Sequence, residues 1–280
     1  MRELIQELKH IKVAIFDLDG VVYRGQVLIP NVDNIIQDLK DLSIRVVYNS
    51  NNSTITRQMY VERLKRLNIE CEYSDFYTSA SITSQEITKI KKNANIYVIG
   101  ENGLKEELKA LGHKIIPKPT KSKYNEIDFV IVGLDIHFNY NALAIAQRCI
   151  LEGNAKFYAT NADTTLPVAD GLMPGAGVMV NAVTTCTGKA PIKIFGKPQP
   201  HGINLIIKEE AIKPNQAIIF GDRVETDILA GNRAGINTAI VLTGVTTKTM
   251  MDDLNLNFDS LDKDLIPDFI YNNLDEIFSN

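Results

Sequence analysis

The sequence lacks the features that would assign it to a membrane or to a nucleic acid. No apolar run approaches the roughly 18 residues that a membrane-spanning helix needs. The opening MRELIQELKH has no apolar segment of the kind found in signal peptides. The formal net charge is −4, so the basic excess typical of nucleic-acid-binding domains is missing as well. We therefore expect a cytoplasmic protein with no membrane or nucleic-acid partner.

Cysteine is scarce and repeats are missing. The three cysteines, Cys71, Cys149 and Cys186, are far apart and show no metal-ligand spacing, so we expect reduced thiols. No internal repeat or low-complexity stretch occurs. The 280 residues, 45% of them hydrophobic and 23% charged, have ordinary globular composition. They suffice for one large domain or two smaller ones.

Apolar runs alternate with helical patterns along most of the chain. In the outer parts of the sequence, strands are predicted at 13–16, 44–48, 192–195, 217–220 and 238–242, with a last strand within 267–271. Helices are predicted after most of them, and residues 248–266 are left without a predicted structure. This alternation predicts a mainly parallel sheet with helices on both faces.

The middle of the chain carries its own alternating set. Strands are predicted at 96–100, 128–133 and 156–160, and helices at 102–111, 139–152 and 176–187. We therefore predict an α/β fold with a doubly wound, Rossmann-like core, formed by residues 1–82 and 189–280. A smaller α/β domain, residues 83–188, is inserted in it. The linkers are placed near 78–81 and 187–191.

Short segments rich in polar residues follow four predicted strands of the outer domain, where each strand ends. They are Asp17, Leu18, Asp19 and Gly20 after the first strand, Ser50, Asn51 and Asn52 after the second, Lys197 after the strand at 192–195, and Asp222 and Asp227 after the strand at 217–220. The carboxyl ends of parallel strands share one edge of a sheet, so these residues are expected to converge. Each cluster alone is typical of a turn, a surface lysine or a helix cap. Four together favour a functional site.

The side chains in these clusters suit magnesium and phosphate. Carboxylate oxygens without histidine or cysteine are the ligands that Mg²⁺ prefers. Lys197 adds a positive charge, Ser50 a hydroxyl, and the residues after Ser50 backbone N–H groups, all of which bind phosphate. One carboxylate could then attack phosphorus while another donates a proton to the leaving alcohol. This chemistry leaves open which aspartate does which.

The four motifs resemble those of the haloacid dehalogenase-like phosphatase superfamily, whose pattern is DxDx(T/V), Ser or Thr, Lys and a final acidic cluster. Here they read DLDGV, Ser50, Lys197 and GDRVETD. The resemblance implies that Asp17 is the nucleophile and Asp19 the general acid and base, with the higher pKa on Asp19. It also implies the remaining roles: phosphate binding by Leu18, Gly20, Ser50, Asn51, Asn52 and Lys197, and Mg²⁺ binding by Asp17, the Asp19 carbonyl, Asp222 and the acidic cluster that includes Asp227.

The inserted segment resembles a narrower subgroup, that of 4-nitrophenylphosphatases, pyridoxal phosphatases and phosphoglycolate phosphatases, which carry a large α/β cap. The stretches that carry this resemblance are residues 47–53, 132–140, 159–167 and 174–177. It implies that Asn161 and Asp163 lie in a loop over the active site, where they either contact substrate or brace the loop. It also suggests a homodimer through the cap. Glu225 departs from the subgroup, which often has Asp there.

We therefore expect a Mg²⁺-dependent phosphatase for a small phosphorylated metabolite. Phosphoglycolate or 4-nitrophenyl phosphate is favoured, and pyridoxal phosphate, sugar phosphates and nucleotides remain open. Tyr23, just after the DxD motif, either flanks the leaving group or packs in the interior. The alternative is a phospho-accepting, Mg²⁺-binding regulatory module without turnover, which would leave the inserted domain unexplained. No GxGxxG follows a strand, so a nucleotide-binding oxidoreductase is disfavoured.

Overall fold

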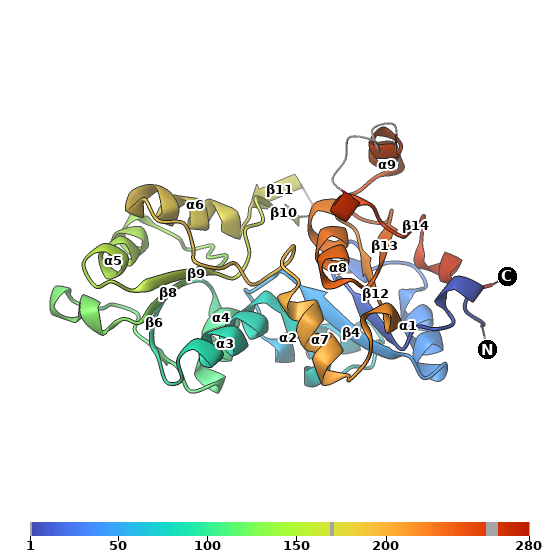
Figure 1. Ribbon diagram of the computed structural model, residues 1–280, viewed down its shortest axis with the longest axis horizontal. Helices are drawn as coiled ribbons and strands as arrows, with labels where there is room; N and C mark the ends of the chain where they lie inside the picture. The colour runs from blue at the N-terminus through green and yellow to red at the C-terminus, as the bar shows by residue number, and fades with distance from the viewer. Residues whose placement is uncertain (1, 169–170, 256–262, 280) are drawn as a thin grey trace. The chain divides into compact units, whose positions relative to one another are not determined.

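The computed structural model describes residues 2–168, 171–255 and 263–279 (Figure 1). The chain divides into two compact units. The core unit comprises Met1–Ser50, Val61–Tyr77 and Lys197–Asn280, and the insert unit comprises Asn51–Tyr60 and Thr78–Gly196. The insert unit thus takes in residues 51–60, 78–82 and 189–196, which lie outside the predicted inserted domain. Backbone hydrogen bonds give the reason for the first of these segments, because the N–H groups of Gly103 and Leu104 donate to Thr54 and Ser53.

The core unit is built on a six-stranded sheet in the order β14-β13-β12-β1-β4-β5. Its strands are β1 (Val13–Phe16), β4 (Arg45–Ser50), β5 (Phe76–Thr78), β12 (Ala217–Gly221), β13 (Asn237–Val241) and β14 (Phe269–Tyr271). The pairings from β14 through β12 and β1 to β4 are parallel. Every residue of β1 and β12 is buried, as expected for central strands covered on both faces. The predicted α/β fold is confirmed.

Helices accompany this sheet in the predicted alternation. They are α1 (Val32–Asp41), α2 (Arg57–Arg66), α7 (His201–Glu209), α8 (Leu229–Ala234) and α9 (Lys248–Asn255), with short turns η1 (Gln6–Leu8), η2 (Tyr73–Asp75), η4 (Pro214–Gln216), η5 (Val224–Ile228), η7 (Lys263–Leu265) and η8 (Leu274–Ile277). In α1 the buried residues Val32, Ile35, Ile36 and Leu39 recur at helical spacing and face the core. The chain from 61 to 66 places the later turns of α2 in the core unit, while residues 57–60 belong to the insert unit.

The insert unit has its own four-stranded parallel sheet, in the order β7-β6-β8-β9. Its elements are β6 (Asn95–Ile99), β7 (Lys114–Ile115), β8 (Phe129–Val132), β9 (Lys156–Ala159), the hairpin β10 (Thr165–Val168) and β11 (Gly171–Pro174), α3 (Ser79–Ile90), α4 (Asn102–Ala110), α5 (Tyr140–Leu151), α6 (Ala176–Thr187) and η3 (Lys121–Glu126). One apolar cluster of this unit runs from Tyr97 in β6 to Val183 in α6. The predicted strands and helices of this region are thus confirmed.

One predicted strand is wrong, because residues 192–195 are not a strand of the core sheet. They run beside β9, where Ala159 N–H donates to Lys193 and Phe195 N–H donates to Ala159, both at 3.1 Å. The expected linker near 78–81 coincides with the passage from the core unit to the insert unit between Tyr77 and Thr78. Its residues are also the start of α3, because the Thr78 hydroxyl accepts from the Ser81 N–H at 3.1 Å and caps the helix.

A short hairpin directly after β1 was not predicted. It consists of β2 (Tyr23–Arg24) and β3 (Val27–Leu28), paired antiparallel. Tyr23 has 0% exposure. Of its two predicted roles, flanking a leaving group or packing in the interior, the structure supports packing.

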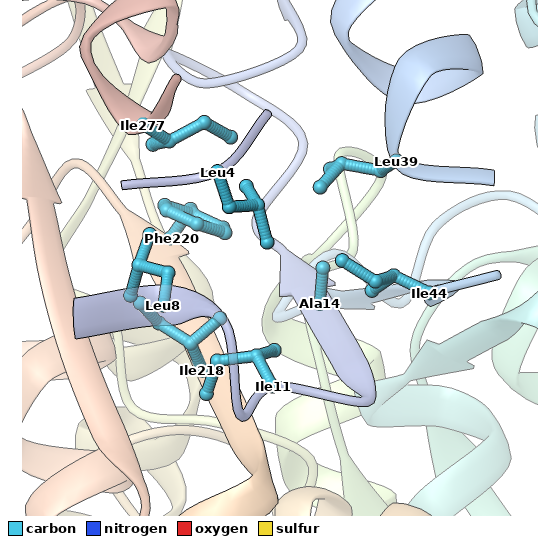
Figure 2. A pocket seen from close by; sticks show the side chains of 9 residues that line it. All are labelled: Leu4, Leu8, Ile11, Ala14, Leu39, Ile44, Ile218, Phe220 and Ile277. Atoms are coloured by element: carbon cyan, nitrogen blue, oxygen red, sulfur yellow. The ribbon is translucent and has the colours of Figure 1, made fainter. Parts of the chain in front are cut away.

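A small cavity lies in the core unit beside the sheet (Figure 2). Its volume is about 10 Å³, and its lining is entirely apolar: Leu4, Leu8, Ile11, Ala14, Leu39, Ile44, Ile218, Phe220 and Ile277. Such a cavity is a packing gap, because it has no polar group to hold even one water molecule. Among the described residues, no helix is both long and apolar enough to cross a membrane.

Candidate active site

The two acidic motifs, one after β1 and one after β12, meet because these strands are neighbours in the sheet. Phe16 pairs with Phe220, and the Asp17 N–H donates to the Phe220 carbonyl at 2.9 Å. Asp17 therefore follows β1 at the point where Asp222 follows β12. Asp17 and Asp222, 205 positions apart in the sequence, lie at one edge, as the parallel arrangement predicts.

Lys197 joins these strand ends from inside the protein. Its side chain is 4% exposed. Its Nζ donates to Asp17 Oδ1 and Asp227 Oδ1, both at 2.5 Å, and to the Asn49 carbonyl at 2.8 Å. Burial alone would lower the pKa of Lys197, but the charges of Asp17 and Asp227 outweigh burial and raise it. Lys197 is therefore expected to stay charged. It reaches the site although residues 192–195, just before it, are not a strand of the core sheet.

Two glycines leave room for the Asp222 carboxyl. A Cβ on Gly244 would lie 2.0 Å from Asp222 Oδ2, and a Cβ on Gly20 would lie 2.3 Å from the same atom. Gly20 also has a φ of +88°, in the region that favours glycine. The Val245 N–H donates to Asp222 Oδ2 at 2.7 Å. Only glycine at these two positions lets the backbone approach the carboxylate this closely.

Asp227 reaches the site from a π-helical turn. The turn η5 precedes α8 and contains Asp227, whose side chain is 2% exposed. The Arg223 N–H donates to Asp227 Oδ2 at 3.1 Å, while Lys197 holds Oδ1. A single π-turn at a functional site is a recurring device for redirecting a side chain. Glu225 lies in the same turn but is exposed, so the departure from the subgroup is at the surface.

Asp17, Asp222 and Asp227 form a cluster that could hold a metal ion. One oxygen from each lies within 4.8 Å of the others. Burial raises the pKa of Asp222 to about 7, with the charge of Asp227 adding to the shift. Burial likewise raises the pKa of Asp17 well above its usual range, against the lowering effect of Lys197. Three carboxylates facing one ammonium favour a further cation.

Asp19 lies in a milder environment than Asp17. Burial raises its pKa, while the charges of Arg63, Lys197 and Arg223 act in the opposite direction. Burial raises the pKa of both carboxyls. The expected order, with the higher pKa on Asp19, assumes the charge of a bound cation beside Asp17 and stays a prediction.

Ser50 ends β4 and is 5% exposed. Tyr48, two residues before Ser50, pairs with Phe16, the last residue of β1. The Leu18 side chain is buried, and the Gly20 N–H donates to the Tyr23 carbonyl at 2.8 Å. The Gly20 N–H is therefore already hydrogen-bonded within the loop. What Gly20 contributes to the site is the room that its missing side chain leaves for the Asp222 carboxyl.

The other predicted residues belong to the insert unit and bond to one another. Asn51 Nδ2 donates to both oxygens of Asp163, at 3.0 and 3.1 Å. Asn161 Nδ2 donates to the Asn51 carbonyl at 2.8 Å, and its Oδ1 accepts from the Asp163 N–H. Asn52 Oδ1 accepts from the N–H and the hydroxyl of Thr54. Asn161 and Asp163 therefore brace the loop that follows β4.

Sequence reasoning missed two contributors. The Asn49 carbonyl binds Lys197, and no side-chain pattern reveals a backbone acceptor. Residues 243–245 follow β13 and surround Asp222 with Gly244 and Val245. The rule that ligands gather at the carboxyl ends of parallel strands applies to β13 as well, and the glycine after that strand was the available signal.

Family models and curated relatives match most of this chain. Residues 14–114 match the family described as haloacid dehalogenase-like hydrolase, and residues 194–277 match the one described as HAD-hydrolase-like. An acid sugar phosphatase of Staphylococcus haemolyticus is 34% identical over 240 residues, 86% of this chain and 88% of that protein. A 5'-nucleotidase of Bacillus subtilis is 33% identical over 251 residues, 88% of this chain and 93% of that protein.

Solved structures share the fold over nearly the whole chain. A 4-nitrophenylphosphatase from Thermotoga maritima has a TM-score of 0.86 at 31% identity and covers 97% of this chain and 98% of its own. A glycerol phosphate phosphatase from Mycobacterium tuberculosis, in complex with magnesium, has a TM-score of 0.85 at 26% identity and covers 99% of this chain and 79% of its own. With the acidic edge and its buried lysine, these matches lead to one conclusion: the chain belongs to the haloacid dehalogenase-like hydrolase family and is one of its phosphoric monoester hydrolases.

Proposed function

We propose that this enzyme is a Mg²⁺-dependent phosphatase that transfers the phosphoryl group of a small phosphomonoester to Asp17 and then to water. The observation that carries the proposal is the buried Lys197 ammonium, bonded to Asp17 and Asp227 at 2.5 Å. It places one positive charge beside the carboxylate that would attack phosphorus. Such a charge offsets the negative charge of the transferring phosphoryl oxygens.

In the first step the Asp17 carboxylate attacks phosphorus, and the bond from phosphorus to the alcohol oxygen breaks. Asp19 donates a proton to that oxygen, so that a neutral alcohol leaves. In the second step Asp19 takes a proton from water, whose oxygen attacks the phosphorus of the aspartyl-phosphate and releases Asp17. Ser50, at the end of β4, would bind the phosphoryl oxygens together with Lys197.

The donor set fits magnesium. It consists of carboxylates alone, without histidine or cysteine, and their total charge exceeds that of Lys197. Asp17, Asp222 and the Asp19 backbone carbonyl would hold the ion. Asp227 is in the same cluster, but with Lys197 on one oxygen and the Arg223 N–H on the other we expect it to orient the lysine. Magnesium, when bound, would supply positive charge toward the phosphoryl oxygens.

For the substrate we propose a phosphorylated sugar hydroxyl, in a sugar phosphate or a nucleoside monophosphate. The names of the two relatives, an acid sugar phosphatase and a 5'-nucleotidase, have this group in common. Phosphoglycolate and pyridoxal phosphate remain predictions from the sequence, and 4-nitrophenyl phosphate is a convenient chromogenic probe. A screen of these phosphomonoesters at saturating Mg²⁺ would rank them by kcat/KM.

The test is the variant Asp17→Asn, assayed with 4-nitrophenyl phosphate and Mg²⁺. We expect a loss of kcat of at least about 10³-fold, because the nucleophile is removed. The control is Asp41→Asn, at an exposed position at the end of α1. Retained turnover in Asp17→Asn would refute the assignment of the nucleophile. A single phosphorylation of the wild-type protein without further turnover would instead favour the regulatory module.

A further inference from the structure

Arg63 in α2 lies against the hairpin that follows the catalytic loop. Its guanidinium carbon is 3.7 Å from the centroid of the Tyr23 ring. The same guanidinium donates through Nη2 to the carbonyl of Gly25, in the turn of the hairpin. Its Nε is buried and has no hydrogen-bond partner among the described residues, as expected for a guanidinium stacked on a ring. One side chain thus holds both the first strand and the turn of the hairpin.

The hairpin is in turn bonded to the loop that carries Asp19. The Tyr23 N–H donates to the Leu18 carbonyl at 3.2 Å, and the Gly20 N–H donates to the Tyr23 carbonyl at 2.8 Å. Asp19 and Tyr23 also form a β-bridge. Tyr23 therefore cannot shift without moving the backbone on both sides of Asp19.

The segment after β13 provides a second restraint on the same loop. The Thr243 hydroxyl donates to the Gly20 carbonyl at 2.7 Å, and Arg24 Nε donates to the Thr243 carbonyl at 2.6 Å. The loop is therefore held by the segment after β13 and, through Tyr23, by α2. Removal of either restraint leaves the other in place, so the fold tolerates a change at Arg63.

We propose that Arg63 is a positioning residue, which orients the Asp19 carboxyl toward the leaving-group oxygen by clamping the Tyr23 hairpin. This inference rests on the proposed function, in which Asp19 protonates the leaving alcohol. The geometry of general acid catalysis is demanding, because the proton must travel along a hydrogen bond of about 2.6–3.2 Å. A loop that drifts by 1 Å would lose that contact without losing Asp17.

The test compares leaving groups. A nitrophenolate leaves without a proton, whereas an aliphatic alcohol needs one. We expect Arg63→Met to reduce kcat/KM, which reports the first step alone and not the hydrolysis of the aspartyl-phosphate, by about 10- to 100-fold with glycerol phosphate, within the range of general acid catalysis, and by less than about 3-fold with 4-nitrophenyl phosphate. Arg63→Lys keeps the charge over the ring and should recover part of the loss. Arg66→Met, at an exposed position of the same helix, is the matched control.

A double-mutant cycle completes the experiment. In kcat/KM, Asp19→Asn should show a stronger form of the same leaving-group dependence, and adding Arg63→Met to it should have little further effect. Equal losses with both substrates, or additive losses in the double variant, would overturn the proposal and leave Arg63 a structural residue. Activity in Asp17→Asn would overturn the proposed function instead, so the two failures can be told apart.

Discussion

The core unit and the insert unit are built on the same plan, yet they differ in how the charges at their sheet edges are bonded. Both have parallel strands that end on a common side. In the core unit these ends bring Asp17, Asp222 and Lys197 together in the interior. In the insert unit the polar groups there, such as Asn161 and Asp163, are bonded to neighbouring backbone and side chains. A parallel sheet offers an edge, but a site arises where the edge carries charges that the protein does not neutralise.

The largest effect on this contrast is expected from Lys197→Met. Without the ammonium, the carboxylates of Asp17, Asp222 and Asp227 face one another, and Asp17 loses its only basic partner in the described cluster. We expect kcat with 4-nitrophenyl phosphate to fall by about 10²- to 10³-fold, the usual cost of removing one electrostatic group. Lys189→Met, at an exposed position of the insert unit, should leave kcat within about 2-fold. Comparable losses of kcat in both variants would contradict a special role of the lysine in the core unit.

The insert unit has a buried ion pair of its own, with a structural role. Arg57 donates from Nε and Nη2 to the two oxygens of Glu107, at 2.8 and 2.7 Å. Glu107→Ala should lower the free energy of unfolding by about 1–3 kcal/mol, because it removes both carboxylate acceptors from a largely buried guanidinium. Glu106→Ala, exposed on the same helix, should change it by less than about 0.5 kcal/mol. Urea denaturation followed by circular dichroism measures both, and equal effects would contradict the role of the pair.

The core carboxylates should make stability fall with rising pH when magnesium is removed by a chelator. The pKa of Asp222 is about 7 in the folded protein, against an ordinary value of 3.8. The folded state therefore binds more protons than the unfolded state between these values, and stability decreases as pH rises from about 4 to about 7. Asp222→Asn should flatten the slope. An unchanged slope in thermal melts across this range would show that Asp222 does not titrate as expected.

The smallest effect, of opposite sign, is expected from His113 in the insert unit. Its Nδ1 accepts from the Ala94 N–H at 3.2 Å, so the neutral ring carries its proton on Nε2, 2.8 Å from the Thr88 hydroxyl. Burial lowers the pKa of His113 below its ordinary value. The unfolded state then binds the proton first, and stability is lost as pH falls below about 6.5. His113→Gln should weaken this loss, whereas His10→Gln at an exposed position should preserve it.

Local patterns were enough to find most of the elements. The buried runs of β1 and β12 and the 3.6-residue spacing of α1 are properties of short segments. The family motifs were also local, and they located Asp17, Lys197 and Asp222. The failures concern segments whose structure depends on distant partners. Residues 192–195 have the composition of a core strand but pair with β9, and the β2–β3 hairpin is too short to produce a pattern.

The sequence by itself determined the α/β class, the order of the elements and which charged residues stand at strand ends, because each follows from the period and chemistry of a few neighbouring residues. Only the tertiary structure decided how those charges are shared. Lys197 bonds to Asp17 although no strand of the core sheet precedes it. Gly20 and Gly244 make room for Asp222. Arg63 holds the Tyr23 hairpin. These relations join residues up to 224 positions apart, and a contact at such a distance depends on how the whole chain packs.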